Sequence, residues 1–550
     1  MSIILTIQTT KKQNKILDNK TMHRYSKTTK LLYFTFLFMS LMACKYVDEQ
    51  KKEKGFVYIE ENSFKIDGED FFPLMLNYVI QYREIEDEIF ISASKNYELP
   101  YEFEYDTKEG SLNQLDVHFG LIKDLGFNTI RICMDRVELD ENGKHYYATE
   151  NRNLYINENS KKLIDAVEEL LEIASNNELK IMLLIKPPIA NKELENFTVN
   201  ILKRFHKNTT IFAYDFMNEP LYLDSEPVRK KKNALKIVKN WSNLMKRHAP
   251  YQLFTIGFAE PIEVFQWDPY LLPVDFVQFH TYHPLRVPNE IYWYSKYIGK
   301  PWMVGETALP ADNDSISYQM QVQFIKDAYR YTIDCGGAGF GWWEFQEWKH
   351  THFEAEFTGL LTHEGKTITP KGEILGTLKP AALEVANLKN YKKQEPQKAV
   401  NYHNMMGYNN ICINGKIINK SNNKPIEGAV IRGWNEYWSV GMNTFSDENG
   451  EFTLYSNDEC IHFEISAPGM SKVKFDATIE YQNIGNNTIS FDSLPNRYLE
   501  YHQISFLSFL KDTVLENSTS NYPIFDFDKE MFFNAKFQGK MEDIYLKPIR

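Results

Sequence analysis

The chain has 550 residues, which is long for one hydrophobic core, so we expect two or more domains. Its 74 acidic residues outnumber its 62 basic residues, and the formal net charge is −12. A chain with this charge repels nucleic acid and anionic lipid, which excludes both as expected partners and leaves neutral polysaccharide as a compatible one.

The first 43 residues resemble a targeting segment. They contain seven Lys or Arg residues and one acid, Asp18, and end in an apolar run over residues 31–43 that is too short to span a bilayer comfortably. The sequence Leu-Met-Ala before Cys44 resembles the bacterial lipobox. We therefore expect residues 1–44 to be a signal peptide with lipobox, and Cys44 to be lipidated as the first mature residue.

Two questions about this segment stay open. An uncleaved N-terminal anchor is the alternative to a cleaved signal, and translation starts at Met1 or at Met22. Either way, we expect the rest of the chain outside the cytoplasm, lipid-anchored to a bacterial outer membrane at the cell surface or in the periplasm. Loss of seven basic residues and one acidic residue lowers the formal net charge from −12 to −18.

A charged tether is predicted over residues 45–55, followed by a hairpin. The runs Phe56–Ile59 and Phe64–Gly68 have the alternating apolar pattern of two β-strands. Hairpins of this kind often cover the bottom of a barrel.

Short apolar runs then alternate with amphipathic stretches. Eight runs are predicted strands: Phe72–Asn77, Phe127–Ile132, Lys180–Ile185, Ile211–Met217, Leu253–Phe258, Asp275–His280, Trp302–Gly305 and Gly337–Trp343. Apolar residues at helical spacing are clearest in four stretches: Leu112–Leu125, Ser160–Ala174, Lys230–Arg247 and Tyr318–Ile333.

This alternation predicts an α/β fold, a (β/α)₈ TIM barrel over residues 56–384. Eight βα units within roughly 300 residues is the size of such a barrel. An open doubly wound sheet is the competing fold, but no glycine-rich phosphate loop follows any predicted strand.

One long predicted connection, Gln81–Gly110, is acidic and aromatic. It follows the first strand, and loops on that face of a barrel build the active site. We expect either a wall or lid of the cleft or a surface excursion packed on the barrel side.

The segment Tyr214–Pro220 ends an apolar strand in an Asn-Glu-Pro step. We expect Pro220 to end the strand and to hold Glu219 in extended geometry at the strand tip. Partial burial there is expected to raise the pKa of Glu219, so that it donates a proton at neutral pH. A solvated loop acid is the alternative.

A second strand, within Pro301–Thr307, ends in Glu306. Two carboxyl groups on the tips of different barrel strands can lie about 5–5.5 Å apart, as a retaining double displacement requires. One carboxyl group then protonates the leaving oxygen while the other attacks the anomeric carbon.

Together with His280-x-Tyr282 and Arg131, the two strand ends at Glu219 and Glu306 resemble those of clan A glycoside hydrolases. The nearest match is glycoside hydrolase family 5, the cellulase-like group, over about residues 56–360. The resemblance implies that Glu219 is the general acid/base and Glu306 the nucleophile. A two-carboxylate mechanism requires no metal and no organic cofactor.

The resemblance also implies a substrate-binding set around the pair. Asn218 would bind the sugar 2-hydroxyl, Tyr282 would orient Glu306, and His280 would line the same wall. Arg131 would keep the nucleophile ionised. A plain ion-pair role for Arg131 and a structural role for His280 are the alternatives.

Two tryptophans end the eighth predicted strand. Adjacent strand residues point opposite ways, so one of Trp342 and Trp343 faces the barrel interior, and we favour Trp342 as the residue that stacks on the sugar. Glu344 and Glu347 follow the same strand; we expect surface positions for them, and substrate binding is the alternative. One departure from the family is Lys186-Pro187-Pro188, where the third strand often carries a histidine.

The C-terminal part is predicted to be all β. Residues 385–410 are a polar linker, and 411–492 have the turns of a small sandwich. The stretches Lys424–Ala429 and Thr444–Phe452 resemble the carboxypeptidase-regulatory-like, prealbumin-type domain, usually an accessory module. Residues 493–550 show no clear pattern.

Four cysteines besides Cys44 are scattered without metal-ligand spacing, so no metal site is expected: Cys133, Cys335, Cys412 and Cys460. Cys412 and Cys460 lie in the same predicted domain. They form either a disulfide in an oxidising compartment or two thiols.

The preferred function is a retaining hydrolase of a β-linked oligo- or polysaccharide, of β-mannan or β-glucan type. A non-catalytic surface glycan-binding protein on a degenerate barrel is the alternative from a different class. A transglycosylase would use the same residues, and product analysis would separate it from a hydrolase.

Overall fold

The computed structural model describes residues 52–549 except 96, 98–106, 135–136, 150–151, 186–190, 221–223, 225–228, 260, 283–285, 315, 349–355, 398–410, 435–440, 457–458, 491–523 and 527–530. The predicted signal segment, Cys44 and Lys186-Pro187-Pro188 lie outside the described residues. No helix among the described residues is long and apolar enough to cross a membrane.

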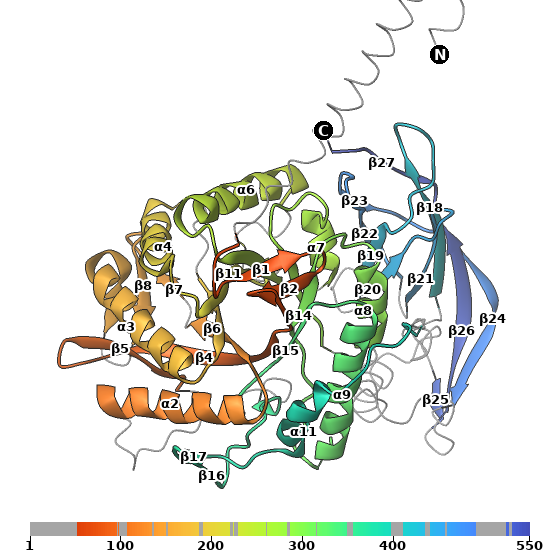
Figure 1. Ribbon diagram of the computed structural model, residues 1–550. Helices are drawn as coiled ribbons and strands as arrows, with labels where there is room; N and C mark the ends of the chain where they lie inside the picture. The colour runs from red at the N-terminus through yellow and green to blue at the C-terminus, as the bar shows by residue number, and fades with distance from the viewer. Residues whose placement is uncertain are drawn as a thin grey trace, which may run out of the picture. The chain divides into compact units, whose positions relative to one another are not determined.

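A closed parallel barrel forms the larger part of the described chain (Figure 1). Its eight described parallel strands follow chain order around the ring, and β15 closes the ring by pairing with β4. They are β4 (Leu74–Ile85), β6 (Thr129–Met134), β10 (Lys180–Leu184), β11 (Ile211–Asn218), β12 (Leu253–Phe258), β13 (Val277–His280), β14 (Trp302–Glu306) and β15 (Gly339–Trp342). The predicted TIM barrel is confirmed, and each predicted strand overlaps an observed one.

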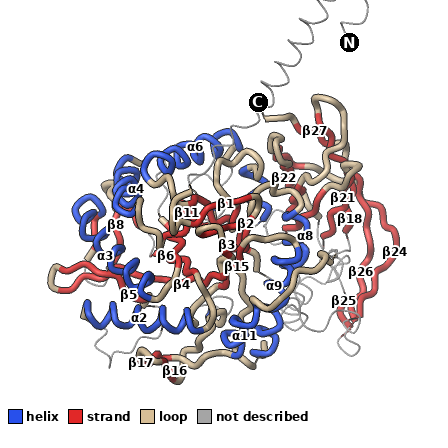
Figure 2. The backbone as a smooth tube through the Cα atoms, in the orientation of Figure 1, coloured by secondary structure: helices blue, strands red, loops and turns tan. Residues whose placement is uncertain are grey.

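Helices surround this ring, as Figure 2 shows. Those in the described part are α2 (Lys108–Asp124), α3 (Ile156–Asn176), α4 (Lys192–Phe205), α6 (Lys231–His248), α7 (Pro261–Trp267), α8 (Arg286–Ser295), α9 (Tyr318–Asp334) and α11 (Pro380–Leu388). Side chains satisfy the first backbone N–H groups of several helices: Thr107 caps α2, Asn191 caps α4 and Ser317 caps α9. Helix α11 includes residues 385–388, which were assigned to the linker, because Val385 and Leu388 are buried.

The predicted hairpin covers one end of the barrel. Strands β1 (Val57–Glu60) and β2 (Ser63–Ile66) pair antiparallel, and β3 (Glu69–Phe71) extends them to three strands. The ring of Phe64 lies edge-on to Phe212 and Phe276, each with centroids 5.1 Å apart. Because these partners lie near the beginnings of barrel strands, the apolar hairpin seals the end opposite the strand tips.

The connection Gln81–Gly110 differs from the prediction of a loop. Strand β4 continues to Ile85 and turns into β5 (Glu88–Ala93), and the two pair antiparallel. Strand β5 contacts α2 and α3, and Tyr82 and Phe90 are buried. This half is therefore packed on the barrel side. Tyr101, Phe103 and Tyr105 lie outside the described residues.

Short hairpins decorate the barrel. Strands β7 (Val137–Leu139), β8 (His145–Ala148) and β9 (Asn153–Tyr155) form one small sheet. Strands β16 (Lys366–Thr369) and β17 (Gly372–Leu375) form another, which contacts α2.

The C-terminal part forms two antiparallel-rich sheets. One contains β20 (Gly441–Phe445), β19 (Val430–Trp434), β22 (His462–Ser466) and β23 (Val473–Asp476) in that order. The other contains β21 (Glu451–Ser456), β18 (Ile411–Asn419), β26 (Met531–Lys540) and β24 (Tyr481–Ser490), with β25 (Ile524–Asp526) and β27 (Ile544–Leu546) paired to it.

Strands β25, β26 and β27, near the chain end, belong to this β-domain, although residues 493–550 show no clear pattern in the sequence. Strand β26 lies between β18 and β24, so the domain defined as residues 411–492 lacks an inner strand of its own sheet. Cys412 and Cys460 are thiols in this structure.

The β-domain packs against helices of the barrel. Phe445 on β20 packs against Phe265, Tyr294 and Tyr297. Beside this aromatic cluster, the hydroxyl of Ser466 donates to the Phe265 carbonyl oxygen at 2.6 Å. The β-domain therefore shares a packed interface with α7 and α8.

Candidate active site

The two predicted glutamates lie at the tips of two barrel strands, β11 and β14, that are separated in the ring by β12 and β13. Glu219 follows the last residue of β11, and Glu306 is the last residue of β14. The backbone N–H of Glu219 still donates to the Gly257 carbonyl oxygen of the next strand at 2.7 Å. Its φ of +44° is left-handed, so the extended geometry expected before Pro220 is wrong. A non-glycine residue held there indicates backbone strain of the kind found at functional sites.

The side chains of these two residues meet around a histidine. One oxygen of Glu219, one nitrogen of His280 and one oxygen of Glu306 lie within 4.8 Å of one another. His280 Nδ1 is 2.8 Å from Glu219 Oε1 and 3.4 Å from Glu306 Oε2. The His280 side chain is fully buried, whereas that of Glu219 is 22% exposed. The pair is therefore close, and Glu219 is the member open to solvent.

Both oxygens of Glu306 are hydrogen-bonded. Arg131 Nη1 donates to Oε1 at 2.5 Å, and the hydroxyl of Tyr282 donates to Oε2 at 2.5 Å. Burial raises the pKa of Tyr282 well above its usual value, and the Glu306 charge adds to the rise. The phenol therefore keeps its proton and remains a donor to the carboxylate.

Arg131 is fully buried and is held by Asn218 and by two residues that were not predicted as site residues, Asp215 and Asn77. Asp215 Oδ2 accepts from the Nε of Arg131 at 3.0 Å and lies 2.9 Å from Nη2. Asn77 accepts from Nη1 at 3.0 Å, and Asn218 accepts from Nη2 at 2.7 Å. Burial alone would lower the pKa of Arg131, but the neighbouring anionic groups raise it above its ordinary value. The guanidinium therefore stays charged against Glu306.

A polar layer beneath the glutamates completes this support. Gln278 Nε2 donates to Asp215 Oδ2 at 2.8 Å, and the Gly257 N–H donates to Asp215 Oδ1 at 3.0 Å. A Cβ on Gly257 would lie within about 3 Å of Asp215, Gln278 and Arg131, so glycine leaves the room that this layer occupies. One signal was present in the sequence: a charged Asp within an apolar strand needs a buried partner.

The pKa of Glu219 is lowered in this structure, contrary to the expectation. Burial acts to raise it, but the hydrogen bond and charge of His280, followed by the charge of Arg131, outweigh burial. The expectation failed because it considered burial alone and left out the histidine.

The structure corrects the choice between the two tryptophans. Trp342 is fully buried, its ring lies against Phe324 of α9, and its Nε1 donates to the Thr358 carbonyl oxygen at 3.2 Å. It cannot present a face to a sugar. By strand alternation Trp343 points the other way, and it is partly exposed.

Glu344 and Glu347 are buried, so the expected surface positions are wrong. The hydroxyl of Tyr97 donates to Glu344 at 2.8 Å, and Glu347 forms an ion pair with the buried Lys379. Burial raises the pKa of Glu344 well above its usual value, and the Glu306 charge contributes to the rise. Burial and the nearby Glu306 charge thus both favour the protonated form of Glu344.

The spacing of Glu219, His280 and Glu306 would also suit a metal ion. However, Arg131 and Tyr282 already occupy both oxygens of Glu306. A guanidinium beside the carboxylate opposes a second positive charge there, which favours an anionic carboxylate pair over a metal centre.

Residues 104–337 match the family model described as cellulase (glycosyl hydrolase family 5). The matched stretch contains Arg131, Glu219, His280, Tyr282 and Glu306. Residues 104–337 are therefore similar to the cellulase domain of glycosyl hydrolase family 5. No curated protein matches the sequence.

Solved structures similar to the chain include two endo-1,4-β-mannanases and one exo-β-1,4-mannosidase. The endo-1,4-β-mannanase of Rhizomucor miehei is 13% identical, with a TM-score of 0.37, over 53% of this chain and 90% of that chain. The exo-β-1,4-mannosidase of Opitutaceae bacterium strain TAV5 is 13% identical, with a TM-score of 0.44, over 60% and 62%. The endo-1,4-β-mannanase of Eisenia fetida is 15% identical, with a TM-score of 0.40, over 63% and 99%.

Proposed function

We propose that the protein is a retaining hydrolase of a β-linked oligo- or polysaccharide. The observation that carries the proposal is the pair of strand-tip carboxylates, whose nearest oxygens lie within 4.8 Å. A retaining double displacement uses carboxyl groups about 5–5.5 Å apart, whereas an inverting reaction needs roughly 6.5–9.5 Å to hold a water between them.

In the first step, an oxygen of Glu306 attacks the anomeric carbon and forms a glycosyl–enzyme ester. The bond from that carbon to the leaving oxygen breaks, and Glu219 gives its proton to that oxygen. In the second step, water attacks the same carbon and gives a proton to Glu219, and the ester bond to Glu306 breaks. The sugar leaves with its original anomeric configuration.

The neighbouring residues fit these roles. Arg131 and Tyr282 hold Glu306 by one bond to each oxygen, which fixes the carboxylate for attack. Asn218 Oδ1 is taken by Arg131, so its amide N–H group is the part left to donate to a sugar hydroxyl. We assign the stacking role to Trp343 in place of Trp342.

The lowered pKa of Glu219 has a consequence for the reaction. A carboxyl group with a low pKa holds its proton only in acid, so the free enzyme is expected to work best below neutral pH. A sugar that fills the cleft displaces water and strengthens the burial that raises the pKa of Glu219.

The test is the stereochemistry of the product. The protein is incubated with β-mannan and with β-glucan, and the anomeric signals of the released sugars are followed by NMR before they equilibrate. Retention supports the proposal, and initial inversion contradicts it. Glu306→Gly with added azide should release a glycosyl azide of inverted configuration. Release of reducing sugar at the wild-type rate by that variant would remove the nucleophile assignment.

We also propose that Cys44 carries a lipid and that the barrel acts outside the cytoplasm, anchored to a bacterial outer membrane. The support is the lipobox-like sequence that precedes Cys44. Cys44→Ala should move the protein from the membrane fraction to the soluble fraction and abolish incorporation of labelled palmitate. An unchanged distribution contradicts the lipid anchor.

A further inference from the structure

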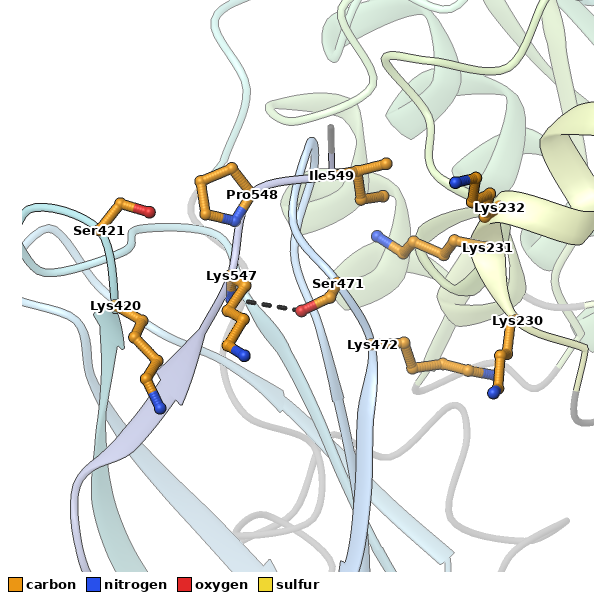
Figure 3. Close-up of a pocket in the computed structure, with 10 residues that line it drawn as sticks. All are labelled: Lys230, Lys231, Lys232, Lys420, Ser421, Ser471, Lys472, Lys547, Pro548 and Ile549. Carbon is orange, nitrogen blue, oxygen red and sulfur yellow. Dashed lines mark hydrogen bonds between the residues drawn. The ribbon is translucent and has the colours of Figure 1, made fainter.

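A cavity of about 720 Å³ lies between the beginning of α6 and the β-domain (Figure 3). Six of its lining residues are lysines, contributed by the barrel and by three separate parts of the β-domain: Lys230, Lys231, Lys232, Lys420, Lys472 and Lys547. Two serines, Pro548 and Ile549 complete the lining. We refer to this cavity as the lysine pocket.

Positive charge in the lysine pocket is only partly balanced. Lys231 Nζ lies 3.0 Å from Asp268 Oδ2, and Lys472 Nζ lies 3.2 Å from Glu464 Oε1. The other four lysines are exposed, and none forms an ion pair with a carboxylate among the described residues. Lysines gathered in this way create a local positive potential that attracts anions. This potential stands out because the net charge of the chain is −12.

The inner wall of the pocket is fixed by a buried polar cluster. Asp268 is fully buried and accepts from Lys231 Nζ and from the Gly469 N–H, the latter at 2.8 Å. Lys231 also donates to the Ala467 carbonyl oxygen at 2.8 Å. This cluster ties α6 to the β-domain and holds the two walls at a set separation.

The chain end forms the opposite wall. The Ser471 N–H donates to the Lys547 carbonyl oxygen at 2.7 Å, and the Ile549 N–H donates to the Gly469 carbonyl oxygen at 3.0 Å. The Lys547 N–H in turn donates to the Ser471 hydroxyl at 3.2 Å, as Figure 3 shows. Lys547 is therefore placed by backbone bonds, so its position is set before a ligand binds.

We propose that the lysine pocket binds the anionic groups of an acidic saccharide, as a site separate from the catalytic pair. Lysine ammonium groups are compact point charges that bind carboxylate, sulfate and phosphate oxygens. The lining residues include no aromatic ring on which a nucleic-acid base would stack. Pro548 and Ile549 are the only apolar lining residues, too few to anchor a lipid surface.

The choice of a saccharide rests on the proposed function. Helix α6 begins after the connection that leaves the tip of β11, so its first residues lie toward the end of the barrel that carries Glu219. Glu219 and Glu306 would repel an acidic group of the substrate. The charge of that group must therefore be bound at a distance from the sugar that is cleaved. The lysine pocket supplies such a place.

The binding test uses the full mature chain with Glu306→Gln, so that binding is measured without turnover. Calorimetry compares a sulfated dextran oligosaccharide, an oligogalacturonate and a neutral dextran oligosaccharide of equal length. The pocket variant removes the four unbalanced lysines and keeps the buried Lys231: Lys230→Ala, Lys232→Ala, Lys420→Ala and Lys547→Ala. The matched control removes four exposed lysines elsewhere: Lys54→Ala, Lys207→Ala, Lys389→Ala and Lys392→Ala.

We expect at least one acidic oligosaccharide to bind and its affinity to fall tenfold or more in the pocket variant. The control variant should change the affinity by less than twofold, and the neutral oligosaccharide should not distinguish the variants. Equal losses in both variants, or no binding of either acidic oligosaccharide, would overturn the proposal. Equal melting temperatures of both variants check that the fold is intact.

Two further probes separate other sources of an anion. Inorganic phosphate and vesicles of phosphatidylglycerol are titrated in the same way. Pocket-dependent binding of either probe without any binding of the acidic oligosaccharides overturns the proposal in favour of a free ion or a lipid headgroup. Hydrolysis is assayed with the wild-type protein, so loss of the pocket result leaves the proposed function standing, and failure of hydrolysis leaves the binding result standing.

Discussion

The two ends of the same barrel strands contrast sharply. At the beginnings of the strands, Phe64 of the hairpin packs against Phe212 and Phe276, and apolar side chains fill the space. Toward the strand tips, just beneath the glutamates, Arg131 and Asp215 form a fully buried ion pair, and Arg131 also supports Glu306. One end is held by burial of apolar surface, and the other by hydrogen bonds between charged groups.

The residues that stabilise the fold and the residues that serve the reaction therefore lie at opposite ends of the same strands. Buried charged groups contribute little net stability, because their desolvation opposes their attraction. They fix geometry instead, as Arg131 does for Glu306. Substitutions at the strand beginnings should therefore change unfolding, and substitutions at the tips should change turnover.

The largest expected effect is at the catalytic tips. Glu306→Gln and Glu219→Gln should each lower kcat by about 10³-fold or more, because each removes a group that reacts or transfers a proton. Steady-state kinetics on the best polysaccharide measure this, and circular dichroism checks the fold. Glu88→Gln, at an exposed position on β5, is the matched control and should keep full activity. Full activity in either catalytic variant would falsify the assignment.

At the other end of the barrel, Phe64→Ala should lower the stability of the fold and leave the activity nearly unchanged. Phe64 is 1% exposed, so its truncation should lower the free energy of unfolding by about 3–5 kcal/mol. Activity per folded molecule should stay within about twofold of wild type below the melting temperature. Urea unfolding measures the loss, and Ile368→Ala, at a position 74% exposed, should change it by less than about 0.5 kcal/mol.

The two tryptophans allow both profiles to be tested within one strand. Trp343→Ala should lower kcat/KM by about tenfold, a loss of ~1.4 kcal/mol that fits one aromatic stacking contact. Trp342→Ala should mainly lower stability, by about 3–5 kcal/mol, since its ring is buried against α9. Kinetics and urea unfolding on both variants decide the matter. A tenfold loss of kcat/KM in Trp342→Ala, with stability lowered mainly in Trp343→Ala, would return the stacking role to Trp342.

A smaller effect concerns stability in acid. His118 is fully buried beside Tyr78, and burial lowers its pKa to about 3. The unfolded chain binds a proton at this residue near pH 6.5, whereas the folded chain does not. Stability is therefore retained above pH 6.5 and falls below it by about 1.4 kcal/mol per pH unit. In His118→Gln the slope between pH 6 and 4.5 should be smaller by that amount, as urea unfolding at several pH values can measure. An unchanged slope would contradict this.

The smallest effect is a shift in the pH profile of activity. His280→Asn removes the charge and hydrogen bond that lower the pKa of Glu219, so that pKa should rise. Because Glu219 must be protonated to act as the acid, the alkaline limb of kcat/KM should move to higher pH. A limb that stays in place, or moves to lower pH, would show that His280 does not set the proton affinity of Glu219.

Much of the fold could be predicted from the sequence because its signals are local. Strand runs such as Leu253–Phe258 coincide with an observed strand, and the period of Tyr318–Ile333 coincides with α9. The β-domain was less predictable. Its strand β26 pairs with β18 from more than a hundred residues away, and pairing at that distance leaves no trace in local periodicity.

The sequence by itself determined that apolar runs alternate with helical stretches, and that two of those runs end in Glu219 and Glu306. The carboxyl ends of all parallel strands lie at the same end of a barrel, so the two predicted glutamates lie at that end together. Only the tertiary structure decided that Trp342 is buried, that Asp215 holds Arg131, and that His280 lowers the pKa of Glu219. These properties depend on side chains from several strands, whose distances are set by closure of the barrel and not by neighbours in sequence.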